Sequence, residues 1–198
     1  KETQEIQAMN IYNNGFTSET TADGVALYST AHTLPSGGTF RNRLSSDSDL
    51  SSSSLEQMLI DFETQFVGDS GIIYRIQPKQ LVVHPDNKRL AIELTQSELR
   101  PTTAVNGGNG ITNVNNMNSL KMDGLEVVSS PHLTDADAWF IQAAPEETGM
   151  RIISRKPIET KAGGPDVGFV NDSILYKCRY REKIGAIHAL GTFGTPGV

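Results

Sequence analysis

The chain has 198 residues, a length that fits one domain or two small lobes. It is 37% hydrophobic, 20% charged and 7% aromatic, which is the balance of a globular protein rather than of a disordered or fibrous one. Because 17 Lys and Arg stand against 23 Asp and Glu, the formal net charge is −6, which disfavours tight binding to duplex DNA through phosphate contacts. The single cysteine, Cys178, excludes an internal disulfide and a cysteine-rich zinc site.

The N-terminal residues predict a helix over 2–13. Ile6, Met9 and Tyr12 recur at three-residue spacing, and the run Asn13-Asn14-Gly15 is typical of a helix end. Residues 15–50 are rich in Thr, Ser and Gly, so we expect irregular structure there with a short strand at Val25–Tyr28. The chain begins at Lys1 and runs directly into the predicted helix, and we interpret it as the later part of a longer chain.

The clearest helix follows. One apolar stripe at positions i, i+3, i+4, i+7 and i+11 consists of Leu55, Met58, Leu59, Phe62 and Phe66. Its N-terminus has two interpretations. Ser53 and Glu56 have the spacing of a capping box, whereas Leu50 and Leu55 have the spacing of a hydrophobic staple. The glycines Gly68 and Gly71 are expected to end it.

The middle of the chain alternates short strands with one more helix. An apolar run predicts a buried strand at Gln80–His84, Pro85 fits a first helical turn, and a helix is expected from there to about Ser97. Further strands are predicted at 125–129, 138–142, 150–155 and 185–193. This mixture of helices and strands predicts an α+β fold.

Residues 101–119 hold six Asn and three Gly, with apolar residues only as singletons. A connection of this length without periodicity is uncommon inside a compact domain. We interpret it as a mobile surface loop, with a binding element as the alternative. Its candidate contact residues are Asn106, Asn109, Asn113 and Asn115.

The strand predicted at 174–183 alternates in chemistry. One face carries Ile174, Tyr176, Cys178 and Tyr180, and the other carries the cations Lys177, Arg179, Arg181 and Lys183. The apolar face predicts a buried, inert Cys178. The cations have two interpretations that the residues alone leave open: a solvated edge that discourages strand addition, or a row of partners for carboxylates on a neighbouring subunit.

No catalytic or metal-binding set is evident. The four histidines (His32, His84, His132 and His188) are about fifty residues apart, and the sequence has neither a nucleophile elbow nor a phosphate-binding loop. We therefore expect no enzyme activity, no cofactor and no metal. The alternative is a hydrolase that uses Ser29 or Ser173 with His32 or His188.

Four blocks of the sequence, in order, resemble the major capsid proteins of tailed bacteriophages with the Hong Kong 97-type fold, and most closely the Mu-like prophage head-subunit branch. The blocks are Ala22–His32 (ADGVALYSTAH); Pro78–Val83 with Ser97–Pro101; Leu125–Val128 with Pro131–Asp135 and Ala138–Phe140; and Ile174–His188. Together they span most of the chain.

The resemblance implies two domains. Residues 1–50 would be the end of the spine helix and a connecting segment of the peripheral domain, 51–145 the axial domain, and 146–198 the return strands of the peripheral domain. It leaves open whether the last strand rejoins the axial domain. The chain departs from the family's pattern because it lacks the N-terminal arm and extended loop that precede the spine helix, so it corresponds to a C-terminal portion of the fold.

The resemblance also implies a structural subunit of an icosahedral shell. The expected partners are other copies of the chain in pentamers and hexamers, together with scaffold, portal or decoration proteins and packaged DNA bound without sequence specificity; no membrane partner is expected. Such a subunit is made in the bacterial cytoplasm and ends in the virion. The cations and asparagines named above are the candidate subunit-interface residues. An encapsulin-like compartment shell and a host- or glycan-binding module are the remaining alternatives.

Overall fold

The computed structural model describes residues 2–68, 70–98, 118, 120–121, 124–163 and 175–198. Three helices are present in this part: α1 (Glu2–Asn14), α2 (Ser52–Thr64) and α3 (Lys88–Gln96), the last preceded by a 3-10 turn at Pro85–Asn87. The strands are β1 (His32–Thr33), β2 (Thr39–Phe40), β3 (Pro78–Val83), β4 (Glu126–Ser129), β5 (Trp139–Ala143), β6 (Met150–Ala162), β7 (Tyr176–Ala186) and β8 (Thr192–Thr195). This mixture confirms the predicted α+β class.

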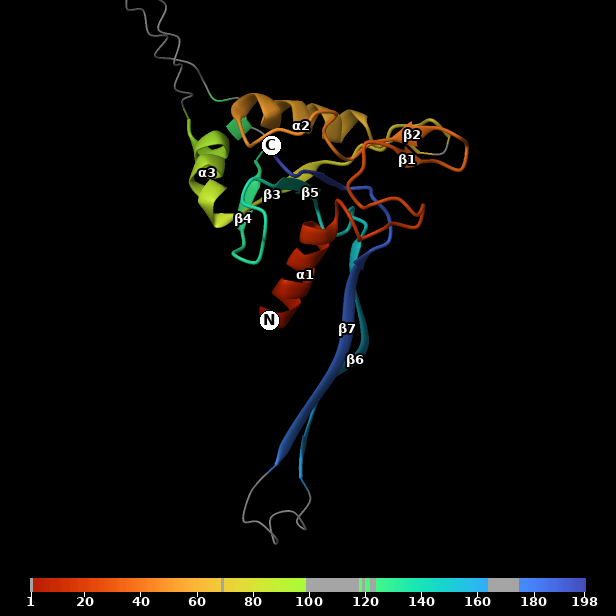
Figure 1. The fold of residues 1–198 in the computed structure, drawn as a ribbon, viewed down its shortest axis with the longest axis vertical. Coiled ribbons are helices and arrows are strands. Elements are labelled where there is room, and N and C mark those ends of the chain that lie inside the picture. Colours follow the sequence, from red (N-terminus) through yellow and green to blue (C-terminus); the bar gives the residue numbers. More distant parts are fainter. Residues whose placement is uncertain (1, 69, 99–117, 119, 122–123, 164–174) are drawn as a thin grey trace, which may run out of the picture.

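A four-stranded sheet in the order β4-β3-β5-β8 is the centre of the molecule. Only the β3–β4 pair is parallel. β6 and β7 form a separate antiparallel hairpin that extends away from the rest of the molecule (Figure 1). We call this hairpin the arm and the other described residues the body.

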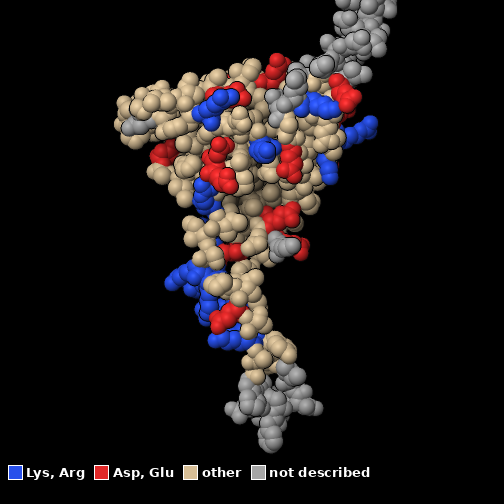
Figure 2. Space-filling model, turned by 180° about the vertical axis from the view of Figure 1, so that it is seen from behind, with Lys and Arg blue, Asp and Glu red and all other residues tan. Residues whose placement is uncertain are grey.

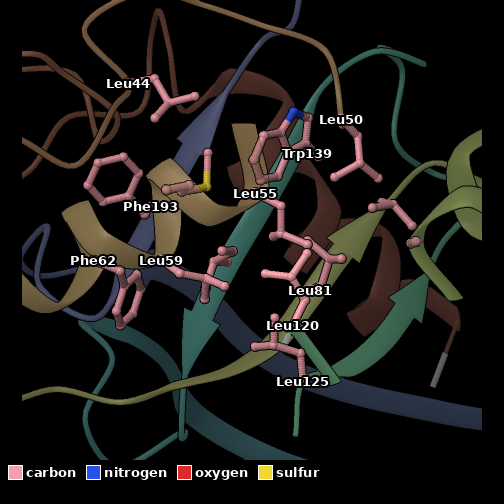
Figure 3. Close-up of a cluster of buried hydrophobic side chains, with 14 of the residues drawn as sticks. Leu44, Leu50, Leu55, Leu59, Phe62, Leu81, Leu120, Leu125, Trp139 and Phe193 are labelled. Carbon is pink, nitrogen blue, oxygen red and sulfur yellow. The ribbon is translucent and has the colours of Figure 1, made fainter. Parts of the chain in front are cut away.

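The central sheet is covered on both faces, because alternate residues of its strands enter two different apolar clusters. Leu81 and its partner Ile141 belong to the cluster under α2 (Figure 3). Val82 and its partner Phe140 belong to the second cluster, together with Tyr12 of α1. Figure 1 shows α1 and α2 on opposite sides of the sheet. The body therefore has two apolar layers, and α1 connects the second one to the base of the arm.

The N-cap of helix α2 is Ser51, not Ser53 of the predicted capping box. The Ser51 side chain accepts from the backbone N–H of Ser54, and the Ser54 hydroxyl accepts in return from the N–H of Ser51. The predicted box of Ser53 and Glu56 is therefore wrong by two residues. With Ser51 as N-cap, Leu50 and Leu55 occupy the staple positions, and both are buried in the same cluster. The helix ends at Thr64, before the glycines expected to end it.

Three predicted strands differ from those observed. Val25–Tyr28 is not a strand: only Ala26 makes an isolated bridge, to Thr20. β6 continues to Ala162, well beyond the predicted end at Arg155. The strand predicted over 185–193 is divided between the end of β7 and the start of β8, because the chain turns between Ala186 and Thr192 to enter the central sheet.

Candidate functional site

The arm is a ribbon of two long strands, exposed over most of its length. β6 and β7 pair from Met150 opposite Ala186 at the base to Ala162 opposite Tyr176 at the outer end, with irregularities between Ser154 and Glu159. At about 3.3 Å per residue, strands of this length reach roughly 35–40 Å. Helix α1 packs against the arm near its base, where the Gln4 amide donates to Glu182 at 2.8 Å.

Charge is strongly divided between the arm and the rest of the chain. The two strands of the arm hold eight Lys and Arg and two Asp and Glu, a net charge of +6. The remaining residues hold nine Lys and Arg and 21 Asp and Glu, a net charge of −12. Figure 2 shows Lys and Arg gathered over the arm, with Asp and Glu spread over the body. The overall charge of −6 therefore conceals a cationic projection on an acidic protein.

The register of the arm places the cations on one face, because residues opposite each other in an antiparallel pair point to the same side. We call this the cationic face and define it by Lys156, Lys161, Lys177, Arg179, Arg181 and Lys183. The structure thus brings together the four cations of β7 predicted from the sequence. It adds Lys156 and Lys161 from β6, which lie beyond the predicted end of that strand at Arg155.

Acidic partners on the cationic face are few. Glu159 accepts from the ammonium groups of Lys156 at 2.8 Å and Lys161 at 2.9 Å, and these two hydrogen bonds hold the pKa of its carboxyl below the usual value. Lys161 lies directly opposite Lys177, and Lys156 directly opposite Arg181. Within the described part of the chain, the four β7 cations form no ion pair. As far as the described residues go, the like charges on this face therefore repel each other.

On the other face of the arm, the prediction that Cys178 is buried is wrong. Its thiol is exposed, and Tyr176 on the same face is 71% exposed. Helix α1 covers this face only at the base, where Ile184 packs against the second cluster. Beyond that point the arm extends past the body, so no other described element covers the apolar face of β7. The hydroxyl of Thr160, directly opposite on β6, donates to Sγ at 4.0 Å.

The arm joins the body at a tightly packed junction. The Arg151 guanidinium donates to the carbonyl oxygens of Thr148 at 2.6 Å and Pro145 at 2.8 Å. The backbone N–H of Ile187 donates to the carbonyl of Gly149 at 3.0 Å, and the N–H of Gly149 donates to Leu190 at 3.1 Å. These contacts fix the direction in which the arm leaves the body.

His32, one of the two histidine candidates for a hydrolase, is held in a buried hydrogen-bond network. His32 is fully buried; its Nδ1 lies 2.7 Å from Asp23 and its Nε2 lies 3.0 Å from the side-chain oxygen of Asn42. The Ser29 hydroxyl accepts from the N–H of Ala31 and is not a partner of His32. Both ring nitrogens are thus engaged by residues that hold the 20–42 segment together, and no nucleophile contacts them.

Asp23 is the charged member of this buried network. Partial burial raises the pKa of its carboxyl, but the hydrogen bonds from Thr21, His32 and the backbone of Val25 outweigh burial and hold that pKa below the usual value. The Asn42 amide donates to the carbonyls of Leu27 at 2.6 Å and Ala189 at 3.2 Å. Asn42 therefore ties the N-terminal segment to the turn that precedes β8.

The remaining sequence candidates do not form a site in the described part of the chain. Asn106, Asn109, Asn113, Asn115 and Ser173 lie outside the described residues. No group of three or more His, Cys, Asp or Glu residues converges among the residues that are described. No described helix is long and apolar enough to cross a membrane.

A comparison with protein families identifies the class. The family model described as "Phage capsid protein" matches residues 1–193, almost the whole chain, and the chain therefore belongs to this family. Membership makes it a structural protein of the bacteriophage capsid, of the major capsid type, located in the virion and implied to assemble with other copies of itself in a shell. No curated protein matches the sequence.

Proposed function

We propose that the chain is the major subunit of an icosahedral phage head with the Hong Kong 97-type fold, of the Mu-like prophage branch. In this proposal it is made in the cytoplasm of the host bacterium and assembles as pentamers and hexamers into the shell that encloses packaged DNA. Scaffold, portal or decoration proteins complete the head. Family membership and the four ordered sequence blocks support the proposal.

We further propose a peripheral domain formed by residues 1–50 and 146–198 and an axial domain formed by 51–145. The packing of α1 against β7 supports grouping the two ends of the chain. The pairing of β8 with β5 favours the assignment in which the last strand rejoins the axial domain.

One observation carries the shell function beyond family membership. An isolated two-stranded ribbon is marginally stable in water, yet the arm has 24 strand residues and is exposed beyond the reach of α1. Ile158 and Leu175, which are 73% and 58% exposed, add apolar surface near its outer end. A projection of this kind gains its stability when another molecule covers it, as happens in a closed assembly.

The test is electron microscopy of the product of the complete coding sequence, expressed alone and together with a scaffold protein from the same gene cluster. The expected result is closed shells, capsomers or curved sheets in at least one of the two preparations. A monodisperse monomer or dimer in both preparations, over a range of salt and pH, contradicts the proposal.

A further inference from the structure

We propose that the cationic face of the arm docks on carboxylates of the body of a second copy of this chain. The inference rests on the proposed shell function and names the partner of one surface. It concerns the six residues of the cationic face and assigns them carboxylate partners on another subunit, because the described residues supply only Glu159.

The first argument is the lack of charge compensation among the described residues. Six cations share one exposed face with a single carboxylate, Glu159, which is already shared by two lysines. Two like-charged pairs, Lys161–Lys177 and Lys156–Arg181, lie directly opposite each other. Such pairs are unfavourable in a free sheet. Carboxylates of another molecule that lie between these cations offset their mutual repulsion and form attractive ion pairs with them.

The second argument is that the chain itself provides the complement. The described residues of the body hold seven Lys and Arg and 17 Asp and Glu, a net charge of −10, against +6 on the arm strands, so copies of one sequence attract each other arm to body. The reach of roughly 35–40 Å is enough for the arm to extend beyond its own body. The apolar residues Tyr176 and Tyr180 on the opposite face become covered when the arm is enclosed between copies.

Duplex DNA is the competing occupant, since a cationic ribbon also attracts phosphates. DNA is negatively charged along its whole length, so the acidic body repels all of it, whereas a second copy also carries a cationic arm that can face the acidic body of the first. The charge distribution therefore favours protein over DNA.

A pair of charge reversals tests the proposal. Arg179→Glu with Arg181→Glu inverts the centre of the cationic face, and Lys88→Glu with Arg89→Glu makes the same change of net charge at two exposed positions of α3. Both variants are made in the complete protein, and circular dichroism and thermal unfolding verify that the subunits fold. Assembly is followed by light scattering and electron microscopy at several salt concentrations.

We expect the arm variant to need about a tenfold or higher subunit concentration for assembly, while the α3 variant assembles like the wild type. Added salt should raise the concentration that the wild type needs and should have less effect on the arm variant. Equal effects of the two variants overturn the inference but leave the shell function standing. A wild-type protein that never associates overturns both.

Carbodiimide crosslinking of the shells identifies the occupant directly, because this reagent joins lysine only to a carboxylate that it touches. In shells assembled from a mixture of unlabelled and nitrogen-15-labelled protein, we expect Lys177 and Lys183 to be joined to Asp or Glu of another copy. If these lysines form no intermolecular product, the inference is wrong. If the arm variant assembles normally but packages or binds less duplex DNA, the occupant is DNA.

Discussion

Lys161 and Lys177 lie directly opposite each other on the cationic face of the arm, near the outer end of β6 and β7. Replacing Lys177 by Glu converts a repulsive pair into an attractive one. We expect Lys177→Glu to raise the free energy of unfolding of the isolated subunit by about 0.5 kcal/mol, because both side chains are exposed and the gain is small. Urea unfolding of the unassembled protein measures this change in the free energy of unfolding.

The same substitution is expected to weaken assembly, so the two effects have opposite signs. Lys177→Gln, which removes the charge without reversing it, is the control and should lie between the wild type and Lys177→Glu in both measurements. A Lys177→Glu variant that both unfolds and assembles like the wild type contradicts the prediction.

Asn42 is expected to be the most sensitive polar residue of the body. Its buried side chain accepts from the N–H of Ser29 at 2.9 Å and contacts His32, and it donates to two backbone carbonyls. Asn42→Ala leaves these groups buried without partners, which should lower the free energy of unfolding by about 3 kcal/mol.

Chemical denaturation compares Asn42→Ala with Asn10→Ala, a replacement at an exposed position of α1. The control should change stability by less than about 0.5 kcal/mol. A small effect of Asn42→Ala would mean that water replaces the amide and that the network does not hold the segment.

The sequence predicted the elements whose patterns are local. The apolar stripe of α2, the buried run that became β3 and the alternation of β7 each depend on residues within one segment, and each corresponds to an observed element. The α+β class and the gathering of the four β7 cations on one face followed from the same local periodicities.

What the sequence did not predict depends on tertiary context. The alternation that placed Cys178 on an apolar face is present, but burial also needs a covering layer, and α1 ends its contact at the base of the arm. The length of β6 was missed because Pro157 indicated a strand end, whereas β6 continues through it with register irregularities between Ser154 and Glu159. His32, Asp23 and Asn42 meet through loops that carry no periodic signal.

Gly149 is required by the close approach of the chain at the junction of arm and body. A Cβ at this position would overlap the carbonyl oxygen of His188 and lie 2.6 Å from its Nδ1. Gly149→Ala must displace backbone, so we expect a loss of about 2 kcal/mol in the free energy of unfolding. Gly185→Ala in β7 is the matched control, since a Cβ there meets nothing within 4 Å.

The two glycine variants are compared by thermal and urea unfolding. Gly185→Ala should be neutral or slightly stabilising, because alanine restricts the unfolded chain more than glycine does. Equal stability of both variants would show that the junction relaxes without cost.

His188 lies at the same junction, and its titration is expected to make the fold sensitive to mild acid. Partial burial, and after it the positive charge of Arg151, lower the pKa of its imidazole below the usual value. In the unfolded chain the pKa of a histidine is about 6.5. Between the folded and unfolded pKa values the unfolded state therefore binds more protons, so stability rises with pH. The contribution of neutral His188 is complete above about pH 6.5 and is lost as the pH falls toward the lower, folded pKa.

Urea unfolding near pH 7.5 and near pH 5.5 measures this contribution. The wild type should lose more stability between the two pH values than His188→Gln, whose side chain does not titrate. Asn10→Ala, at an exposed position of α1, is the control without a titrating group and should keep the wild-type dependence on pH. A His188→Gln variant whose stability falls as steeply as that of the wild type would assign the acid sensitivity to other groups. The expected result instead assigns part of the acid sensitivity of the fold to the junction of arm and body.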